Sequence, residues 1–195
     1  MSPGVRPRDD SPLEERPVGA AVPLGPGAHG PGAYAAPVSL DRARTHLDRY
    51  GLGDAVVVTA TSSATVELAA QALGVEPARI AKTLSFRAAE PGRAILVVVA
   101  GDARVDNAAF RATFGVKARM LAGDEVEALT GYPPGGVCPF GNPPSATVHL
   151  DTSLRRFTTV FPACGTASSA VELTPDRLAE VTGGAPWVTV SRLPG

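Results

Sequence analysis

Lys82 is the side chain in this sequence with the clearest capacity for chemistry. The chain has 18 lysine and arginine residues, and only Lys82 and Lys117 among them are lysines. Lys82 lies in the apolar run IAKTLSF (residues 80–86), a pattern that predicts a strand. A compact ammonium, whose pKa shifts readily on burial, does chemistry that a guanidinium cannot do. The run therefore indicates a functional amine, or else a strand-edge lysine whose head group reaches water.

Three further segments have residue types suited to ligand contact. Gly101-Asp102 directly follows the most apolar run of the chain, where ligand contacts or an ordinary turn are expected. Residues 131–141 (GYPPGGVCPFG) predict a stiff loop whose backbone approaches a ligand, or a structural Ω-like loop. Asp151 and the segment ACGT (residues 163–166) fall at two late strand ends, which predicts one shared pocket.

Other chemistries lack their motifs. The three histidines, His29, His46 and His149, have no metal-ligand spacing, so no metal site and no cofactor are expected. The chain has neither a G-x-S-x-G elbow nor a phosphate-binding P-loop. Cys138 and Cys164 lie near no evident base, which favours buried spectator thiols over a nucleophile.

Hydrophobic periodicity predicts the elements that position these residues. The first helix is expected from Ser39, as its N-cap, to a stop at Gly51; the second begins at Ser62 or Ser63 and ends at Gly74. Later helices are expected from Asp106 to Phe114, over 124–129 and after Thr174-Pro175. Strands are expected at 55–58, 80–86, 95–100, 147–150, 158–161, 170–173 and 188–190, with Lys117 on an outer strand. This irregular mixture predicts an α+β fold with a mixed, curved sheet and helices packed outside it.

Composition divides the chain into two parts. Residues 1–36 are rich in proline, glycine and alanine and have no hydrophobic period, so they predict a flexible tail. Residues 37–195 predict a single domain with its own core. A net charge of −1 excludes a generally basic coat protein for nucleic acid, and no DNA partner is expected.

The sequence also predicts the cellular compartment of the protein. Two cysteines outside any CxxC pair favour a reducing cytoplasm. No apolar run approaches the roughly 20 residues that cross a bilayer, and the start of the sequence does not have the pattern of a signal peptide. A cytoplasmic protein with no membrane partner is therefore expected.

Four stretches, in this order, carry a family resemblance: SSATVELAAQALGVEPARIAKTLSF, ILVVVAGDARVD, TGYPPGGVCPFG and HLDTSLRRFTTVFPACGTASSAVELT. Together they resemble the YbaK/EbsC type of aminoacyl-tRNA deacylases, freestanding relatives of the editing domain of prolyl-tRNA synthetases. The resemblance covers residues 39–192 and implies an α+β fold on a mixed, barrel-like sheet. It also implies hydrolysis of the ester that joins a wrong amino acid to the 3′ end of a tRNA.

The resemblance also implies roles for particular residues. Lys82 matches the essential lysine of the family's KTL motif. The loop from Gly135 through Gly136 to Pro139 matches the glycine-x-x-x-proline loop that shapes the amino-acid pocket. Gly101, Asp151 and Gly165 match further positions that line the pocket.

The function expected from this resemblance is trans-editing of a mischarged tRNA, with tRNA-Pro carrying a small wrong amino acid as the substrate. The partners expected are the acceptor end of the tRNA and an aminoacyl-tRNA synthetase. Arginines at 79, 104, 119, 155 and 156 are candidates for tRNA contact. Two alternatives stay open: a non-catalytic module that binds tRNA or a synthetase through the same pocket, and a Schiff-base enzyme that uses Lys82.

Overall fold

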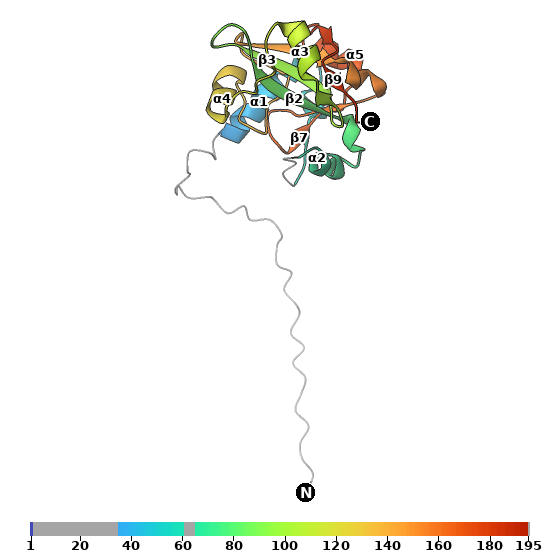
Figure 1. The fold of residues 1–195 in the computed structure, drawn as a ribbon. Helices are drawn as coiled ribbons and strands as arrows, with labels where there is room; N and C mark the ends of the chain where they lie inside the picture. Colours follow the sequence, from blue (N-terminus) through green and yellow to red (C-terminus); the bar gives the residue numbers. More distant parts are fainter. Residues whose placement is uncertain (2–34, 61–64, 195) are drawn as a thin grey trace.

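The computed structural model describes Met1 and residues 35–60 and 65–194 (Figure 1). The expected tail, residues 1–36, lies almost wholly outside this range, as do Ser62 and Ser63. The helices are α1 (Ala35–Asp48), α2 (Val66–Leu73), α3 (Asn107–Phe114), α4 (Gly123–Thr130) and α5 (Pro175–Val181). Three short 3-10 turns are η1 (Gly53–Ala55), η2 (Pro77–Arg79) and η3 (Thr152–Arg156).

One mixed sheet organises the domain. Its strands are β2 (Ile80–Arg87), β3 (Ala94–Ala100), β5 (Ala146–Asp151), β6 (Phe161–Pro162) and β8 (Trp187–Val188). The spatial order is β6-β2-β3-β5-β8. β2 and β3 are antiparallel, and the other three pairings are parallel. The expected α+β class with a mixed sheet is confirmed, and the sheet is open because its two edge strands do not pair with each other.

Two small antiparallel pairs flank this sheet. β1 (Val57–Val58) pairs with β7 (Ser169–Ala170), and β4 (Arg104–Val105) pairs with β9 (Ser191–Arg192). In Figure 1, α2 and β7 lie at one side of the domain and α3 at the other, with β2 and β3 between them.

The core forms around β3, all seven of whose residues are buried. A strand buried on both faces is expected to be apolar throughout, which explains the run AILVVVA. On one side of the sheet α3 presents Phe110, which packs against Phe86 of β2 with ring centroids 4.7 Å apart. No helix among the described residues is long and apolar enough to cross a membrane.

Local signals explain most element ends. The Asp106 carboxylate accepts hydrogen bonds from the backbone N–H groups of Ala108 and Ala109 at the start of α3. Thr174 caps α5, with Pro175 at its first position, and Gly74 ends α2 in the left-handed conformation, as the sequence predicts. The start of α2 is capped by the Thr65 hydroxyl, which accepts from the Leu68 N–H.

Several expected bounds were wrong. Ser39 does not cap the first helix, because α1 begins at Ala35 and Ser39 is buried inside it. The strands expected at 55–58, 158–161, 170–173 and 188–190 are replaced by the two-residue strands β1, β6, β7 and β8, some of them shifted in sequence. Lys117 is not on an outer strand but exposed in the irregular segment between α3 and α4.

Candidate functional site

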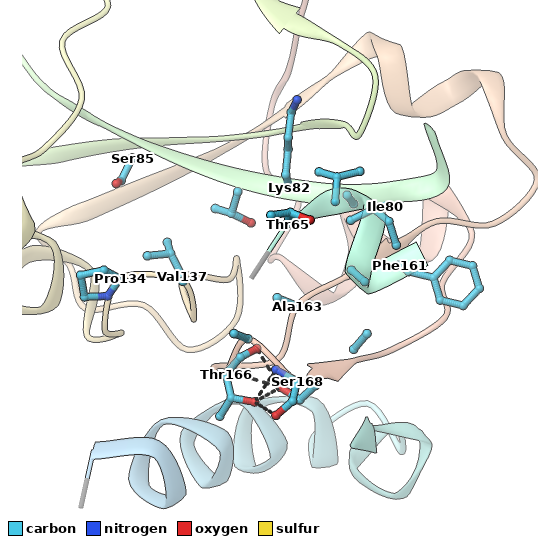
Figure 2. Close-up of a pocket in the computed structure, with 18 of the residues that line it drawn as sticks. Thr65, Ile80, Lys82, Ser85, Pro134, Val137, Phe161, Ala163, Thr166 and Ser168 are labelled. Carbon is cyan, nitrogen blue, oxygen red and sulfur yellow. Dashed lines mark hydrogen bonds between the residues drawn. The ribbon is translucent and has the colours of Figure 1, made fainter. Parts of the chain in front are cut away.

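A cavity of about 410 Å³ lies beside β2 (Figure 2). Its walls come from β2, α2, α4, the loop after α4 and residues 161–170. Most of the side chains that line it are apolar or small: Val66, Ala69, Leu73, Ile80, Ala81, Met120, Leu121, Val126, Pro134, Gly135, Val137, Phe161, Ala163, Ala167 and Ala170. Ligand sites for small molecules commonly have volumes of about 300–1,000 Å³, so this cavity is at the small end of that range.

Lys82 lies at the rim of this cavity. β6 pairs with β2 only at Ile80 and Ala81, and residues 119–121 bond to the same edge at Ser85 and Arg87, so the edge is unpaired only between these two contacts. The Lys82 ammonium donates a hydrogen bond to the backbone carbonyl of Gly101, with 2.9 Å between Nζ and O. In Figure 2 the side chain extends from β2 away from Ala163, Thr166 and Ser168. The ammonium is therefore held at the Gly101 carbonyl and not at the centre of the cavity.

Burial and neighbouring charges both act on the pKa of the Lys82 amine. Burial lowers the pKa of Lys82 below its ordinary value. The charge of Asp102 raises this pKa, that of Arg104 lowers it, and that of Glu67 raises it. Asp102 itself is held by Arg156, whose guanidinium donates to both carboxylate oxygens.

Two hydroxyls of β2 point the other way. Side chains alternate along a strand, so Thr83 and Ser85 share the face opposite Lys82. Both line the cavity, and Ser85 is only 4 % exposed. The Thr83 hydroxyl is buried without a hydrogen-bond partner in the described part of the chain. Figure 2 shows Ser85 on the side of β2 where Pro134 and Val137 lie.

These hydroxyls were missed by sequence reasoning. Threonine and serine two residues apart in an apolar strand are the signal that was present, because that spacing places them on one face. Their partners in the cavity come from distant segments, which the local pattern does not reveal.

The loop after α4 supplies another wall. Gly135 lines the cavity, and its N–H and that of Val137 donate to no described residue. The Gly136 N–H is already used, because it donates to the Pro133 carbonyl at 2.9 Å. Pro139 is buried and lies outside the cavity, beside a separate groove next to Arg42 and Asn142.

The other expected glycines hold backbones close together. A Cβ on Gly136 would lie 2.4 Å from the Gly165 carbonyl oxygen. A Cβ on Gly165, whose φ is +86°, would lie 2.3 Å from the Ser39 carbonyl oxygen. A Cβ on Gly101 would lie 2.0 Å from the Pro77 carbonyl oxygen. Each position therefore needs glycine for packing of backbone against backbone.

Asp151 does not line the cavity. It is fully buried, and its carboxylate accepts hydrogen bonds from the Ser153 N–H (2.9 Å), the Val190 N–H (2.8 Å) and the Ser191 hydroxyl (2.5 Å). These bonds tie the end of β5 to η3 and to β9. The structure thus brings Lys82, Gly101, Gly135, Gly136 and Gly165 to or beside one cavity, and it places Asp151 and Pro139 elsewhere.

The cysteines and histidines do not form a reactive cluster. Cys138 and Cys164 are free thiols with no exposed surface. Burial raises the pKa of Cys138 to about 11 and also raises that of Cys164, so both stay protonated at neutral pH. Within residues 35–60 and 65–194, no group of three histidine, cysteine or acidic side chains is placed to hold a metal ion.

This cavity, bordered by Lys82 and walled in part by Gly135, is the candidate functional site. Residues 60–181 match the family model of the aminoacyl-tRNA editing domain, and the chain belongs to this family. It is 51% identical over 155 residues to the uncharacterized protein YwhH of Bacillus subtilis (strain 168), covering 80% of this chain and 98% of that protein.

Two further relatives have more informative names. One is "Putative Cys-tRNA(Pro)/Cys-tRNA(Cys) deacylase EbsC" of Enterococcus faecalis, 29% identical over 119 residues that cover 60% of this chain and 72% of that protein. The other is the crystal structure of "a putative trans-editing enzyme for prolyl tRNA synthetase", with a TM-score of 0.71 and 32% identity. That match covers 79% of this chain and 97% of the other.

Proposed function

We propose that this protein is a trans-editing deacylase that hydrolyses the ester of a mischarged tRNA, with tRNA-Pro carrying a small wrong amino acid as its substrate. The observation that supports this most directly is the small cavity with the Lys82 ammonium at its rim, in a chain of the aminoacyl-tRNA editing family. The cavity suits the aminoacyl group, and the rim suits the terminal nucleotide that carries it.

The chemistry demands little of the protein. An aminoacyl ester is already activated, so a positioned water and hydrogen-bond donors for the developing oxyanion suffice. The N–H groups of Gly135 and Val137 are the donors that the loop leaves available at the cavity. Lys82 binds the 3′-terminal nucleotide from the rim and stabilises negative charge near the ester. The buried thiols of Cys138 and Cys164 take no part.

The residues that line the cavity determine which amino acid the enzyme accepts. In an apolar pocket, one methylene more or less changes the binding free energy by about 1–3 kcal/mol, so the shape of the walls tunes which amino acid is accepted. The Thr83 hydroxyl has no partner in the described chain, and an unpaired buried hydroxyl costs about 1–3 kcal/mol. A short side chain that ends in a hydrogen-bonding group relieves this cost. We therefore infer that the enzyme prefers such an amino acid to an apolar one of equal size.

A screen of purified tRNAs, each charged with one amino acid, tests the function. Release of free amino acid from tRNA-Pro carrying a small wrong residue, with correctly charged prolyl-tRNA left intact, is the expected result. No release from any charged tRNA would refute it.

One observation favours a second candidate, a non-catalytic module that binds tRNA or a synthetase. The Lys82 ammonium points away from the centre of the cavity, as a group that only anchors a ligand would. Tight tRNA binding without release of amino acid would support that module. A Schiff-base enzyme predicts instead that borohydride traps a carbonyl compound on Lys82.

A further inference from the structure

Arg104 and Arg192 lie directly opposite each other. They are Cα partners in the antiparallel pair of β4 and β9, and both are exposed. Opposite residues of an antiparallel pair send their side chains from the same face, and like charges in this arrangement destabilise the pair. Two exposed arginines in this arrangement repel each other, and an anion bound between them would relieve that repulsion.

Neither arginine forms an ion pair with an acidic side chain of the described chain. Its five ion pairs use other arginines: Arg79–Glu172, Arg87–Glu125, Arg93–Glu90, Arg156–Asp102 and Arg177–Glu180. The charge of Arg192 contributes to lowering the pKa of Asp106, whose carboxylate accepts two backbone hydrogen bonds at the start of α3.

The pair lies beside Lys82 on a well-fixed support. Arg104 comes three residues after Gly101, whose carbonyl accepts the hydrogen bond of the Lys82 ammonium. Arg192 follows Ser191, whose hydroxyl is held by the buried Asp151 carboxylate. The backbones that carry both arginines are thus held by hydrogen bonds, and Arg104 is near enough to Lys82 for its charge to lower the pKa of that amine.

We propose that Arg104 and Arg192 bind the phosphodiester backbone of the tRNA acceptor end whose terminal ester lies at the cavity. This inference rests on the proposed function. Guanidinium groups bind phosphate oxygens through paired hydrogen bonds, and a phosphate between two facing guanidinium groups removes their repulsion. A local contact of this kind also explains how a chain with a net charge of −1 binds RNA.

The test compares two double variants of equal charge in the full chain. Arg104→Gln with Arg192→Gln removes the proposed contacts. Arg49→Gln with Arg93→Gln is the matched control, since both arginines are exposed, in the turn after α1 and in the turn between β2 and β3. The substrates are a charged tRNA and the corresponding 3′-aminoacyl adenosine, which has no phosphodiester.

We expect the first variant to raise KM for charged tRNA, so that kcat/KM falls about tenfold relative to kcat/KM for aminoacyl adenosine, with kcat maintained. The slope of log(kcat/KM) against log salt concentration should become shallower by about 1.4, or about 0.7 for each lost contact. The control should match the wild type.

Other results would contradict the inference or the proposed function, and the experiment distinguishes the two cases. An unchanged salt slope, or equal losses for both substrates or both variants, would overturn the inference while the deacylase function stands. If the wild type hydrolyses neither substrate, the proposed function fails. The inference is then tested by comparing how tightly the wild type and the variants bind uncharged tRNA. Binding that weakens only in the Arg104/Arg192 variant keeps the inference, and binding that does not weaken rejects it.

Discussion

Gly136 and Gly165 meet backbone to backbone at the cavity wall, so closely that a Cβ on Gly136 would lie 2.4 Å from the Gly165 carbonyl oxygen. If this loop only shaped the amino-acid pocket, as the family resemblance implies, Gly136→Ala would change the amino acid accepted more than the stability. The geometry predicts a different result, because no flexible side chain is there to move aside.

Gly136→Ala should destabilise the protein by about 1–3 kcal/mol, the usual cost of forcing a methyl group into filled space. Denaturant unfolding measures this. Gly123→Ala is the control, because its Cβ would meet nothing within 4 Å and it lies in a helix. Equal stability of the two variants would show that the loop relaxes easily.

Lys82→Ala should fold normally and lose roughly 10²–10³-fold in deacylation, by analogy with the loss of one oxyanion donor. Lys82→Met should be equally inactive, since it keeps the apolar stem and removes the charge. Lys82→Arg should also be poor, because a wide planar guanidinium does not replace a compact ammonium. Lys117→Ala, at an exposed position, should match the wild type. Robust activity of Lys82→Ala would remove this lysine from the mechanism.

The pH dependence should report the Lys82 amine. The protonated form is the one proposed to act, so kcat/KM should fall as the pH rises through the pKa of Lys82. Burial places that pKa below the ordinary value of 10.5, so the decline should begin at lower pH than for an exposed lysine. Hydrolysis without enzyme is subtracted at each pH. A flat profile up to the pH at which the protein unfolds would contradict this role.

Ser85→Ala should keep the fold and change the preference of the enzyme. Removing the hydroxyl should shift the ratio of kcat/KM values from hydrogen-bonding toward apolar small side chains, by about three- to tenfold. Competition between two charged tRNAs measures that ratio. Ser153→Ala is a contrasting variant, because its hydroxyl accepts the Ala100 N–H within the core; it should lose stability without a change in preference.

Cys138→Ala with Cys164→Ala should lose stability, because both thiols are packed in the core, and should keep most of its kcat. In the native wild type, a thiol reagent should react only as fast as the protein unfolds. Abolished turnover in a folded variant would restore a thiol mechanism.

The sequence predicted those parts of the fold that have local causes. Asp106, Gly74 and Thr174-Pro175 mark helix ends because their side chains or conformations act within one turn. The seven-residue strand β3 was visible as an apolar run, whereas two-residue strands such as β6 are too short to show a period. Ser39 was misjudged because a buried serine inside a helix has the same local pattern as a cap.

The candidate site was predictable to the same extent as the fold. Residues with a local signal could be identified from the sequence, and residues brought together from distant segments could not. Lys82 stands out by its residue type in an apolar strand. The face of β2 occupied by Thr83 and Ser85 became meaningful only when α4 and its loop were placed against it. Asp151 shows the opposite case: a charged residue at a strand end indicated a ligand, and the structure instead gives it three internal donors.

The stack of Ser39, Gly136 and Gly165 limits how such a site can diversify. These three backbones touch without intervening side chains, so a larger residue at either glycine disturbs two segments at once. Substitutions on β2 and α4 meet open cavity instead. Changes of substrate during evolution are therefore expected to accumulate on that wall, while the glycine wall is inherited unchanged.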